Sequence, residues 1–321
     1  MKLLILTFGG PDTASTKFRI LQYRDLFKSA GIELYCVPAK EFRDFNKLQD
    51  YDTVLLQKTL LPVLRLRQIR LGSKRLIYDS DDLIWLSPRK KHSLITRLRI
   101  RVRLRALARF TDLCIAANGV IAGELAAYGA ATAVVPMSLD GCIWQDVHRS
   151  GSLLTIGWSG APKNLVFVRQ ILPELINVQR RFPEVRWIFH SGEDPQFKGL
   201  RYIYLPFVPD REHEAVRQFD IGLLPLPDDP FVRGKSPIKS LQYFASRVAV
   251  AGSPIGATCE ILEDGKNALW VRNMEQWVDV LTTLISDNKK RSRIAAAARL
   301  SFESKFDLPI VFEQLKSLLI P

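Results

Sequence analysis

The sequence predicts an α/β fold built from two domains, each with its own parallel sheet. A chain of 321 residues is longer than one hydrophobic core usually supports. Short apolar runs alternate with longer amphipathic stretches along its length, which is the pattern of repeated strand–helix units. That pattern pauses at the polar stretch DVHRSGS, residues 146–152. We therefore expect one domain over 1–148, a second over 149–300, and a C-terminal helix over 301–321 that packs back toward the first.

Six strands are expected in the first domain, because six short apolar runs are bounded by polar or turn-forming residues. A helix, KFRILQYRDLFKSAG, follows the first strand, and Gly31 would end it. Residues 97–105, RLRIRVRLR, alternate arginine with apolar residues, which by period alone favours a strand. Because leucine and arginine are good helix formers and ALARF follows, we predict a helix there. The six strands are KLLILTF, ELYCVPA, TVLLQK, RLIYD, DLCIAA and TAVVPM.

The second domain shows the same alternation. Helices are expected after KNL and at KSLQYFASR, and the last fifty residues are expected to be helical. Ligands of parallel α/β sheets bind at the carboxyl ends of the strands, so the cleft between two such domains is the expected ligand site. His190 ends one strand and is interpreted as structural. The expected strands are LLTIGWSG, RWIFHSG, RYIYLPF, DIGLLPL, VAVAGS and NALWV.

Composition excludes several classes of protein. With 47% hydrophobic and 25% charged residues, the chain is neither disordered nor fibrous. No apolar run reaches the roughly 18 residues of a spanning helix. The opening MKLLILTFGGP lacks a charged leader and a cleavage site, so we interpret it as a first strand and not a secretion signal. The four scattered cysteines show no C-x-x-C pair, which favours a reducing, cytoplasmic location.

The positive charge is concentrated in the first half. The net charge is +13, and residues 1–150 hold 24 basic against 14 acidic side chains, whereas 151–321 hold 22 against 19. This surplus suggests an anionic partner, such as a phospholipid surface, nucleic acid or a polyanionic acceptor, with plain solubility as the alternative. The row Arg97, Arg101 and Arg105, with the basic run RKK before it, is a candidate membrane or acceptor surface. A solvated surface helix explains the same residues, and both interpretations stay open.

The stretch from Asp220 to Val271 carries the most specific motif. A strand ends at Pro225, an acidic turn follows, and a basic loop leads into a helix. A glycine in the loop permits close backbone approach, the helix start offers unpaired N–H groups, and three cations lie within seven residues. This combination predicts a diphosphate-binding site. The residues are Arg233, Gly234, Lys235 and Lys239.

DIGLLPLPDDPFVRGKSPIKSLQYFA and SPIGATCEILEDGKNALWV resemble the corresponding segments of glycosyltransferase family 4, also called group 1. The resemblance is gapless over these segments and weaker in TIGWSGAPKNL, YDSDDLIWL and DLCIAANGVIAGELAAYG. It implies the GT-B fold, in which two Rossmann-like α/β domains face each other across a cleft. The first domain would bind an acceptor and the second a nucleoside-diphosphate sugar. It also implies retention of anomeric configuration, with neither a metal nor a separate cofactor.

The resemblance assigns the donor-binding residues. Many members have two glutamates eight positions apart around the basic loop, and these positions hold Gly234 and Gln242 here. Gln242 would hold the ribose hydroxyls, but the carboxylate that usually contacts the donor sugar is absent. The loop GWSGAPKN supplies a lysine without the usual arginine. The predicted donor set is Gly10, Ser159, Gly160, Lys163, Arg233, Gly234, Lys235, Lys239, Gln242 and Glu260.

Three residues are predicted to be catalytic. Asp81 and Asp82 follow a strand in YDSDD, where they would orient acceptor hydroxyls or take a proton, and helix capping is the alternative. Lys239 would stabilise the departing diphosphate. Asp79-Ser80-Asp81 also matches the D-x-D metal motif of another glycosyltransferase fold, and we reject that interpretation because the two-domain pattern disagrees with it.

The resemblance thus implies a metal-independent hexosyltransferase that acts on a glycan or lipid-linked acceptor in bacterial cell-surface polysaccharide synthesis. It would be cytoplasmic or peripheral on the inner membrane face. The absent glutamate motivates two alternatives of the same fold, a sugar-nucleotide epimerase and a degenerate binding protein. A nucleic-acid-binding protein is disfavoured, because residues 89–109 contain no aromatic side chain for stacking.

Overall fold

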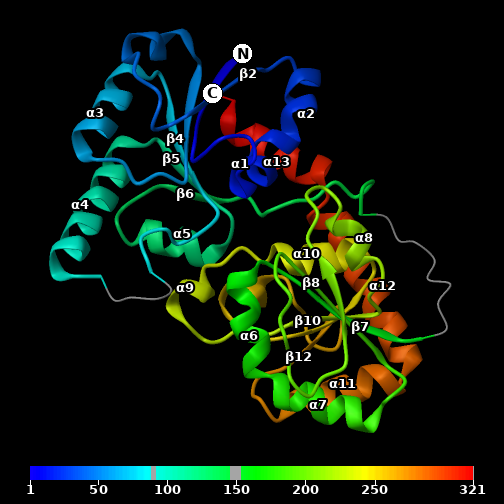
Figure 1. Cartoon of the computed structure of the whole chain (residues 1–321). Coiled ribbons are helices and arrows are strands. Elements are labelled where there is room, and N and C mark those ends of the chain that lie inside the picture. The colour runs from blue at the N-terminus through cyan, green and yellow to red at the C-terminus, as the bar shows by residue number, and fades with distance from the viewer. Residues whose placement is uncertain (88–91, 145–152, 321) are drawn as a thin grey trace. The chain divides into compact units, whose positions relative to one another are not determined.

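The computed structural model describes residues 1–87, 92–144 and 153–320 and divides into two compact units (Figure 1). The first unit comprises Met1–Ser138, Asp229–Ser236 and Leu308–Pro321, and the second comprises Leu139–Asp228 and Pro237–Asp307. The predicted linker 146–152, with the boundary expected at 148, lies outside the described residues. The same holds for the basic residues Arg89, Lys90 and Lys91.

The first unit contains a six-stranded parallel sheet in the order β2-β1-β3-β4-β5-β6. All six predicted strands are confirmed. Strands β3 and β4 are buried along their whole length, which explains why they are almost continuously apolar. The strands are β1 (Lys2–Thr7), β2 (Glu33–Pro38), β3 (Thr53–Gln57), β4 (Leu76–Ser80), β5 (Leu113–Ala116) and β6 (Thr132–Val134).

The helices of the first unit include one that differs from its prediction. The helix expected after β1 is broken at Ile20 into α1, a short 3-10 turn and α2, and Gly31 follows α2 with φ +71°. The arginine-rich stretch is helical, as predicted, and Ser93 caps it by accepting a hydrogen bond from Thr96 N. The helices are α1 (Ala14–Arg19), α2 (Arg24–Ser29), α3 (Val63–Gly72), α4 (Leu94–Phe110), α5 (Gly119–Ala126), α9 (Pro230–Arg233) and α13 (Leu308–Leu319).

The C-terminal helix α13 completes the core of the first unit. Val311, Phe312 and Leu315 pack with Tyr23 and Phe27, and the rings of Phe27 and Phe312 meet edge-on at 5.1 Å. Figure 1 shows α13, in red, beside the blue helices α1 and α2. Residues 301–305 instead continue α12 of the second unit, so the last helix begins later than the sequence indicates.

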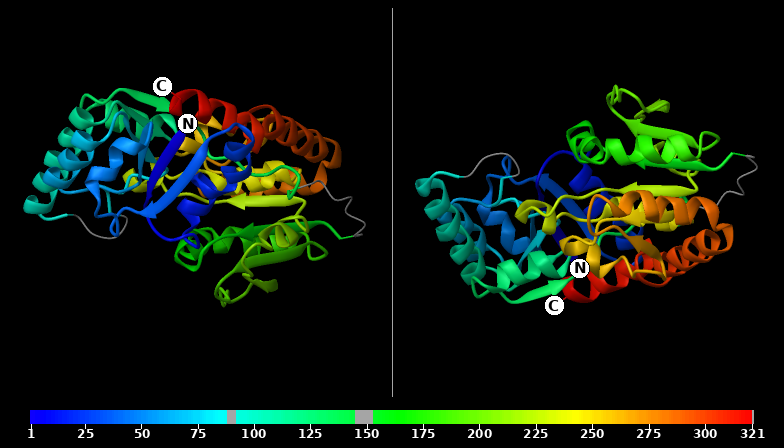
Figure 2. Two further views of the ribbon diagram at one scale, coloured as in Figure 1. Left: turned by 90° about the horizontal axis from the view of Figure 1, so that it is seen from above. Right: turned by 90° about the horizontal axis from the view of Figure 1, so that it is seen from below.

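The second unit has a parallel sheet in the order β12-β11-β10-β7-β8-β9, and its six predicted strands are confirmed. Helical layers flank both sheets in the two further views (Figure 2). The strands are β7 (Thr155–Ser159), β8 (Arg186–Ser191), β9 (Ile203–Pro206), β10 (Ile221–Leu224), β11 (Ala249–Gly252) and β12 (Ala268–Trp270). The helices are α6 (Leu165–Gln170), α7 (Leu172–Arg181), α8 (Glu212–Val216), α10 (Ile238–Ala245), α11 (Gln276–Ser286) and α12 (Asn288–Lys305).

In each sheet, consecutive strands are added first on one side of the starting strand and then on its other side. The change lies between β1 and β3 in the first unit and between β7 and β10 in the second. Doubly wound sheets bind ligands at the carboxyl ends of the strands beside this point. The residues that follow β1, β3, β7 and β10 are therefore where a site is expected in each unit. Among the described residues no helix is both long and apolar enough to cross a bilayer.

Candidate active-site clusters

A polar cluster lies at the carboxyl ends of β7 and β8 in the second unit. Ser159 ends β7 and pairs in register with His190 of β8, so both side chains emerge at the same sheet edge. Ser159 Oγ lies 2.9 Å from His190 Nδ1. The Ser159 backbone N–H donates to the Tyr243 hydroxyl at 3.3 Å, and that hydroxyl donates to Leu223 O at 3.2 Å. Two strand ends and α10 are thereby tied together by buried hydrogen bonds.

Lys239, in the first turn of α10, supplies the charge of this cluster. Its Nζ donates to Gln242 Oε1 at 2.9 Å and to Ser159 Oγ at 3.4 Å. Ser159 Oγ thus lies within hydrogen-bond distance of both Lys239 Nζ and His190 Nδ1. Gln242 is buried, and its amide nitrogen has no protein partner among the described residues. A cation and an amide donor therefore stand at the start of one helix.

His190 is neutral at physiological pH. Burial, together with the nearby Lys239 cation, lowers its pKa to about 4. The neutral ring packs near Phe207, with ring centroids 5.8 Å apart. The sequence interpretation of His190 as structural agrees with this burial, but the bond to Ser159 also places it within the cluster.

This lowered pKa predicts a pH dependence of stability. Unfolded histidine protonates near pH 6.5, whereas folded His190 resists protonation until about pH 4. Its contribution to the free energy of unfolding is thus complete above pH 6.5 and is lost as the pH falls through this window. Urea unfolding midpoints measured across the window should fall less steeply for His190→Gln than for the wild type. Equal slopes would mean that His190 titrates normally.

Three other predicted donor residues, Gly160, Lys163 and Glu260, belong to the second unit. A side chain at Gly160 would place its Cβ 2.4 Å from the Trp158 ring, so the glycine is required locally. Lys163 is exposed in the 3-10 turn Pro162–Asn164. Glu260 is the exposed last residue of the 3-10 helix Gly256–Glu260.

The first unit holds a second cluster at the carboxyl ends of β3 and β4. Lys58 Nζ lies 2.6 Å from Asp82 Oδ2 and 3.0 Å from Asp81 Oδ1. Ser15 Oγ donates to Asp81 Oδ2 at 2.8 Å. Lys58 is buried and has φ +44°, a strained conformation for a lysine that typically marks a functional site. Helix capping by Asp81 and Asp82 is wrong, because the described helix that follows them is capped by Ser93.

Charge is partly balanced in this second cluster. Burial raises the pKa of Asp82, although Lys58 opposes the shift. For Lys58, burial lowers the pKa, but the two carboxylates outweigh it and the pKa is raised. The Asp82 side chain is 29% exposed against 9% for Asp81, so Asp82 is the carboxylate that solvent reaches. It is the better candidate to meet a ligand hydroxyl.

Asp79 has a different role from its two neighbours. Both of its carboxylate oxygens accept hydrogen bonds from Arg19, which also donates to Val135 O at 2.6 Å and to Pro136 O at 2.9 Å. Arg19 and Asp79 are almost completely buried. This pair joins α1 and β4 to the segment that follows β6.

The basic loop predicted to bind diphosphate is divided between the two units. Asp229 caps α9 by accepting hydrogen bonds from Phe231 N and Val232 N, and the segment 229–236 belongs to the first unit. There Asn118 Nδ2 donates to Gly234 O, and the charge of Lys235 acts on Asp82. Lys239 belongs to the second unit, and Arg233 is exposed. The joint role assigned to these cations stays a prediction.

Gly234 is required by its neighbour Leu83. A Cβ at this position would lie 2.3 Å from Leu83 Cγ, and Leu83 is buried. We expect Gly234→Ala to lower the free energy of unfolding by about 1–3 kcal/mol, as overpacking typically does. Gly10→Ala is the matched control, since no atom lies within 4 Å of its Cβ. Denaturant unfolding of both variants tests this, and equal stability would contradict the contact.

A comparison with protein families bears on the cluster of the second unit. Residues 151–287 match the family described as glycosyl transferases group 1. This stretch, which is less than half of the chain, is similar to the group 1 glycosyltransferases. This match includes Ser159, Gly160, Lys163, Lys239 and Gln242, and it does not reach Asp81 or Asp82.

Known proteins similar to the chain extend this result. Spore coat protein SA of Bacillus subtilis (strain 168) is 26% identical over 190 residues, which cover 53% of this chain and 49% of that protein. The match therefore spans about half the length of this curated relative. Anabaena HepE in complex with UDP has a TM-score of 0.72 at 18% identity, covering 99% of both chains. Sucrose-phosphate synthase from Thermosynechococcus elongatus has a TM-score of 0.74 at 12% identity, and the match covers 99% of this chain and 97% of that protein. The fold is GT-B.

Several residues of the two clusters were not among those predicted from the sequence. Gln57 and Lys58 end the run TVLLQK, and their place after a strand beside β1 was the available signal. Gln57 Oε1 accepts from Phe8 N at 3.1 Å, and its amide donates to Ser15 O at 3.0 Å. The role of Tyr243 in the cluster was not predicted, because a tyrosine on an apolar helix face is typical of a buried core residue.

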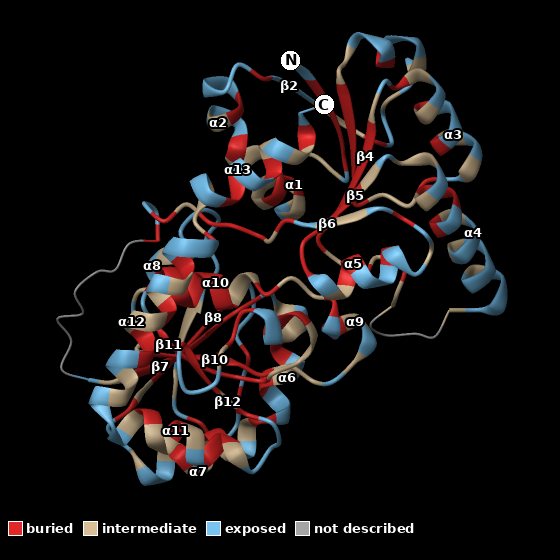
Figure 3. Cartoon of the chain, turned by 180° about the vertical axis from the view of Figure 1, so that it is seen from behind, coloured by how far each residue is buried: buried red, intermediate tan, exposed pale blue. Residues whose placement is uncertain are grey.

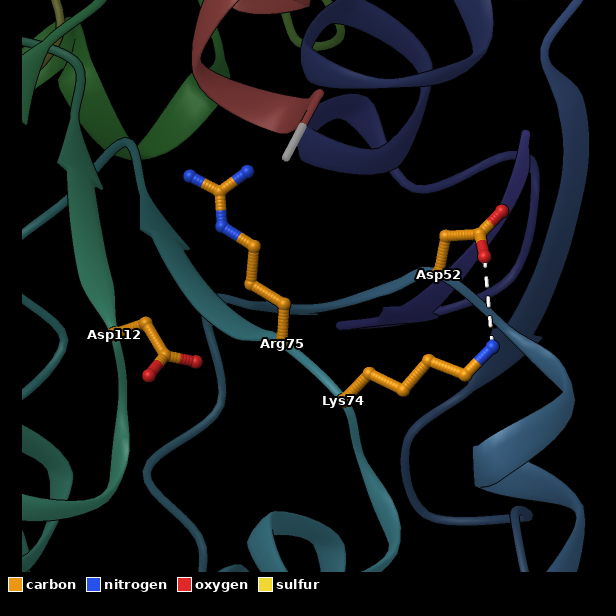
Figure 4. Close-up of a pocket in the computed structure, with 4 residues that line it drawn as sticks. All are labelled: Asp52, Lys74, Arg75 and Asp112. Carbon is orange, nitrogen blue, oxygen red and sulfur yellow. Dashed lines mark ion pairs between the residues drawn. The ribbon is translucent and has the colours of Figure 1, made fainter.

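A recess on the first unit lies away from the strand ends discussed above. It is lined by Asp52, Lys74, Arg75 and Asp112 at the amino ends of β3, β4 and β5 (Figure 4). Lys74 pairs with Asp52 at 3.5 Å, and Arg75 donates to Ile320 O at 2.9 Å. These charges are engaged within the protein, and ligands of parallel sheets bind at the opposite edge. We do not assign the recess to the site.

Proposed function

We propose that the protein is a retaining glycosyltransferase that moves a sugar from a UDP-sugar to a hydroxyl group of a glycan or lipid-linked acceptor. The observation that carries this proposal is the Lys239–Ser159–His190 cluster within the stretch similar to the group 1 glycosyltransferases. The choice of UDP is supported by HepE, whose solved complexes contain UDP and UDP-glucose. The resemblance to family 4 motivates retention.

On the donor side, Lys239 would carry most of the catalytic effect. Negative charge develops on the diphosphate as the bond to the sugar breaks, and a fixed cation at a helix start stabilises that charge. Gln242 keeps an amide donor for a ribose oxygen, and Lys163 lies in the loop after β7. Neutral His190 contributes a hydrogen-bond contact to Ser159.

On the acceptor side, Asp82 is the proposed partner of the attacking hydroxyl. Its raised pKa makes it a better proton acceptor than an ordinary surface carboxylate. Lys58 and Ser15 hold Asp81 and Asp82 in place. Phe8 is 43% exposed beside Lys58, with its ring centroid 5.8 Å from Nζ, and offers an apolar face to a sugar ring.

We place the reaction in bacterial cell-surface polysaccharide synthesis on the cytoplasmic side of the membrane. The family resemblance and the spore coat relative motivate this placement. The proposed reaction needs neither a metal nor a cofactor, because side-chain cations neutralise the diphosphate. We expect donor turnover to be unchanged within about twofold by EDTA, and a loss restored by a divalent cation would contradict this.

Thermal unfolding with UDP, other nucleoside diphosphates and their sugar conjugates is the first test. A ligand at one hundred times its Kd stabilises the folded state by about 2.7 kcal/mol, which is readily measured. A shift with UDP and a larger one with one UDP-sugar supports the proposal. No shift with any nucleotide would overturn it in favour of a degenerate protein. Product analysis by NMR without acceptor then separates an epimerase, which changes the sugar, from a transferase, which gives at most slow hydrolysis.

A further inference from the structure

Helices α3 and α4 of the first unit expose large apolar side chains. Leu64 and Leu71 of α3 are 75% and 76% exposed, and Leu94, Ile95 and Leu98 of α4 are 80%, 72% and 64% exposed. The two helices pack side by side, and Figure 3 shows pale-blue, exposed surface on both (Figures 1 and 3). Isolated exposed leucines are ordinary, but three large exposed apolar side chains within five residues of α4 are of the kind that marks an interaction site.

The same two helices carry one sign of charge only. Neither α3 nor α4 contains an acidic residue. Arg65, Arg70 and Arg103 have partners within the first unit, because they donate to backbone oxygens or to Asp112. The outward arginines have no hydrogen-bond or ion-pair partner within the described part of the chain. They are Arg67, Arg97, Arg99, Arg101, Arg105 and Arg109.

Spacing on α4 places the two kinds of side chain next to each other. Residues 94, 98 and 102 are four apart and share one face of the helix, and Arg97, Arg101 and Arg105 form the adjoining row. Arginine has a long apolar stem with a charge at its tip, so the charge can reach phosphates while leucines in the next row enter a more apolar layer. We call these outward residues of both helices the α3–α4 surface.

We propose that the α3–α4 surface docks on an anionic lipid bilayer, with its leucines in the interface and its arginines on lipid phosphates. A solvated helix does not explain apolar residues on its outer turns. Nucleic acid would match the arginines but leave the leucines without a partner, and a second copy would bring unpaired arginines together. Only an anionic bilayer offers both an apolar layer and phosphates. The proposal stands independently of donor and acceptor chemistry.

Co-sedimentation of the full chain with vesicles tests this surface. Vesicles of phosphatidylcholine alone are compared with vesicles that also contain phosphatidylglycerol, at low and high salt. We expect binding to the anionic vesicles that weakens with salt. Arg97→Gln/Arg101→Gln/Arg105→Gln should lose about fivefold in partitioning for each arginine and show a flatter salt dependence. Leu94→Ser/Leu98→Ser should lose at least about tenfold and keep the wild-type salt dependence.

Matched controls lie on the exposed side of α12. Leu300 is 65% exposed, and Lys289 and Arg293 are exposed. Leu300→Ser and Lys289→Gln/Arg293→Gln should bind vesicles as the wild type does, and all variants should melt alike because every changed residue is exposed. The proposal would be overturned if the wild type bound neither kind of vesicle. It would also be overturned if Leu94→Ser/Leu98→Ser bound anionic vesicles as strongly as the wild type does. Tight binding to duplex DNA that Leu94→Ser/Leu98→Ser leaves unchanged would also overturn it. The same holds if the wild type is a dimer and Leu94→Ser/Leu98→Ser dissociates it.

Discussion

Replacing Arg19 by methionine is expected to lower the free energy of unfolding by about 3–5 kcal/mol, the usual cost of leaving one partner of a buried ion pair behind. Arg19 Nη2 lies 2.7 Å from Asp79 Oδ1, and both side chains are almost completely buried. Burial raises the pKa of Asp79, and the Arg19 guanidinium opposes this shift. Without Arg19, the Asp79 carboxylate is either charged in an apolar core or has to be protonated, and both lower the free energy of unfolding. Urea unfolding measures the loss.

Two further variants separate charge from packing. Arg19→Met/Asp79→Leu removes both charges, and replacing a buried pair by apolar residues is often nearly neutral. We therefore expect the double variant to recover most of the stability, apart from the bonds that Arg19 makes to Val135 O and Pro136 O. Should Arg19→Met fail to fold, Asp79→Asn gives the same comparison with smaller perturbation. A single variant within about 1 kcal/mol of the wild type would show that the pair is not important for folding.

Replacing Lys239 by methionine is expected to reduce donor turnover at least about tenfold, and up to about a thousandfold if it acts as a preorganised donor to the leaving group. Lys239 is partly exposed, and Gln242 and Ser159 are the acceptors of its hydrogen bonds, so folding should change little. Turnover is measured as release of UDP from a UDP-sugar, with or without acceptor. The His190 pKa, followed by NMR, should rise, because Lys239 lowers it.

The control for Lys239 is Lys198→Met, at an exposed lysine of the same unit with no partner among the described residues. It should retain wild-type turnover and the wild-type His190 pKa. If Lys239→Met raises the His190 pKa but leaves turnover intact, the cluster exists and the leaving-group role is wrong. If neither changes, the geometry of the cluster is itself wrong.

The architecture was predictable because it depends on local patterns. Runs such as TVLLQ and LIYDS are too apolar to lie anywhere but in a parallel sheet covered on both faces. The break at Ile20 was not predictable, since the helical pattern continues through it and Arg19 is drawn into the core by Asp79. Similarly, α13 starts at Leu308 because Phe312 and Leu315 pack on Tyr23 and Phe27, which are nearly three hundred positions away.

By itself the sequence determined the two α/β units, the helical state of the arginine-rich stretch and the motif that carries Lys239 and Gln242. Only the tertiary structure separated Asp79, which pairs with Arg19, from Asp81 and Asp82, which gather around Lys58. It also decided that Leu83 occupies the space a side chain at residue 234 would need. The physical reason is that periodicity reports which face of an element is apolar. Which charges meet depends on strand ends that lie together in space but far apart in the chain.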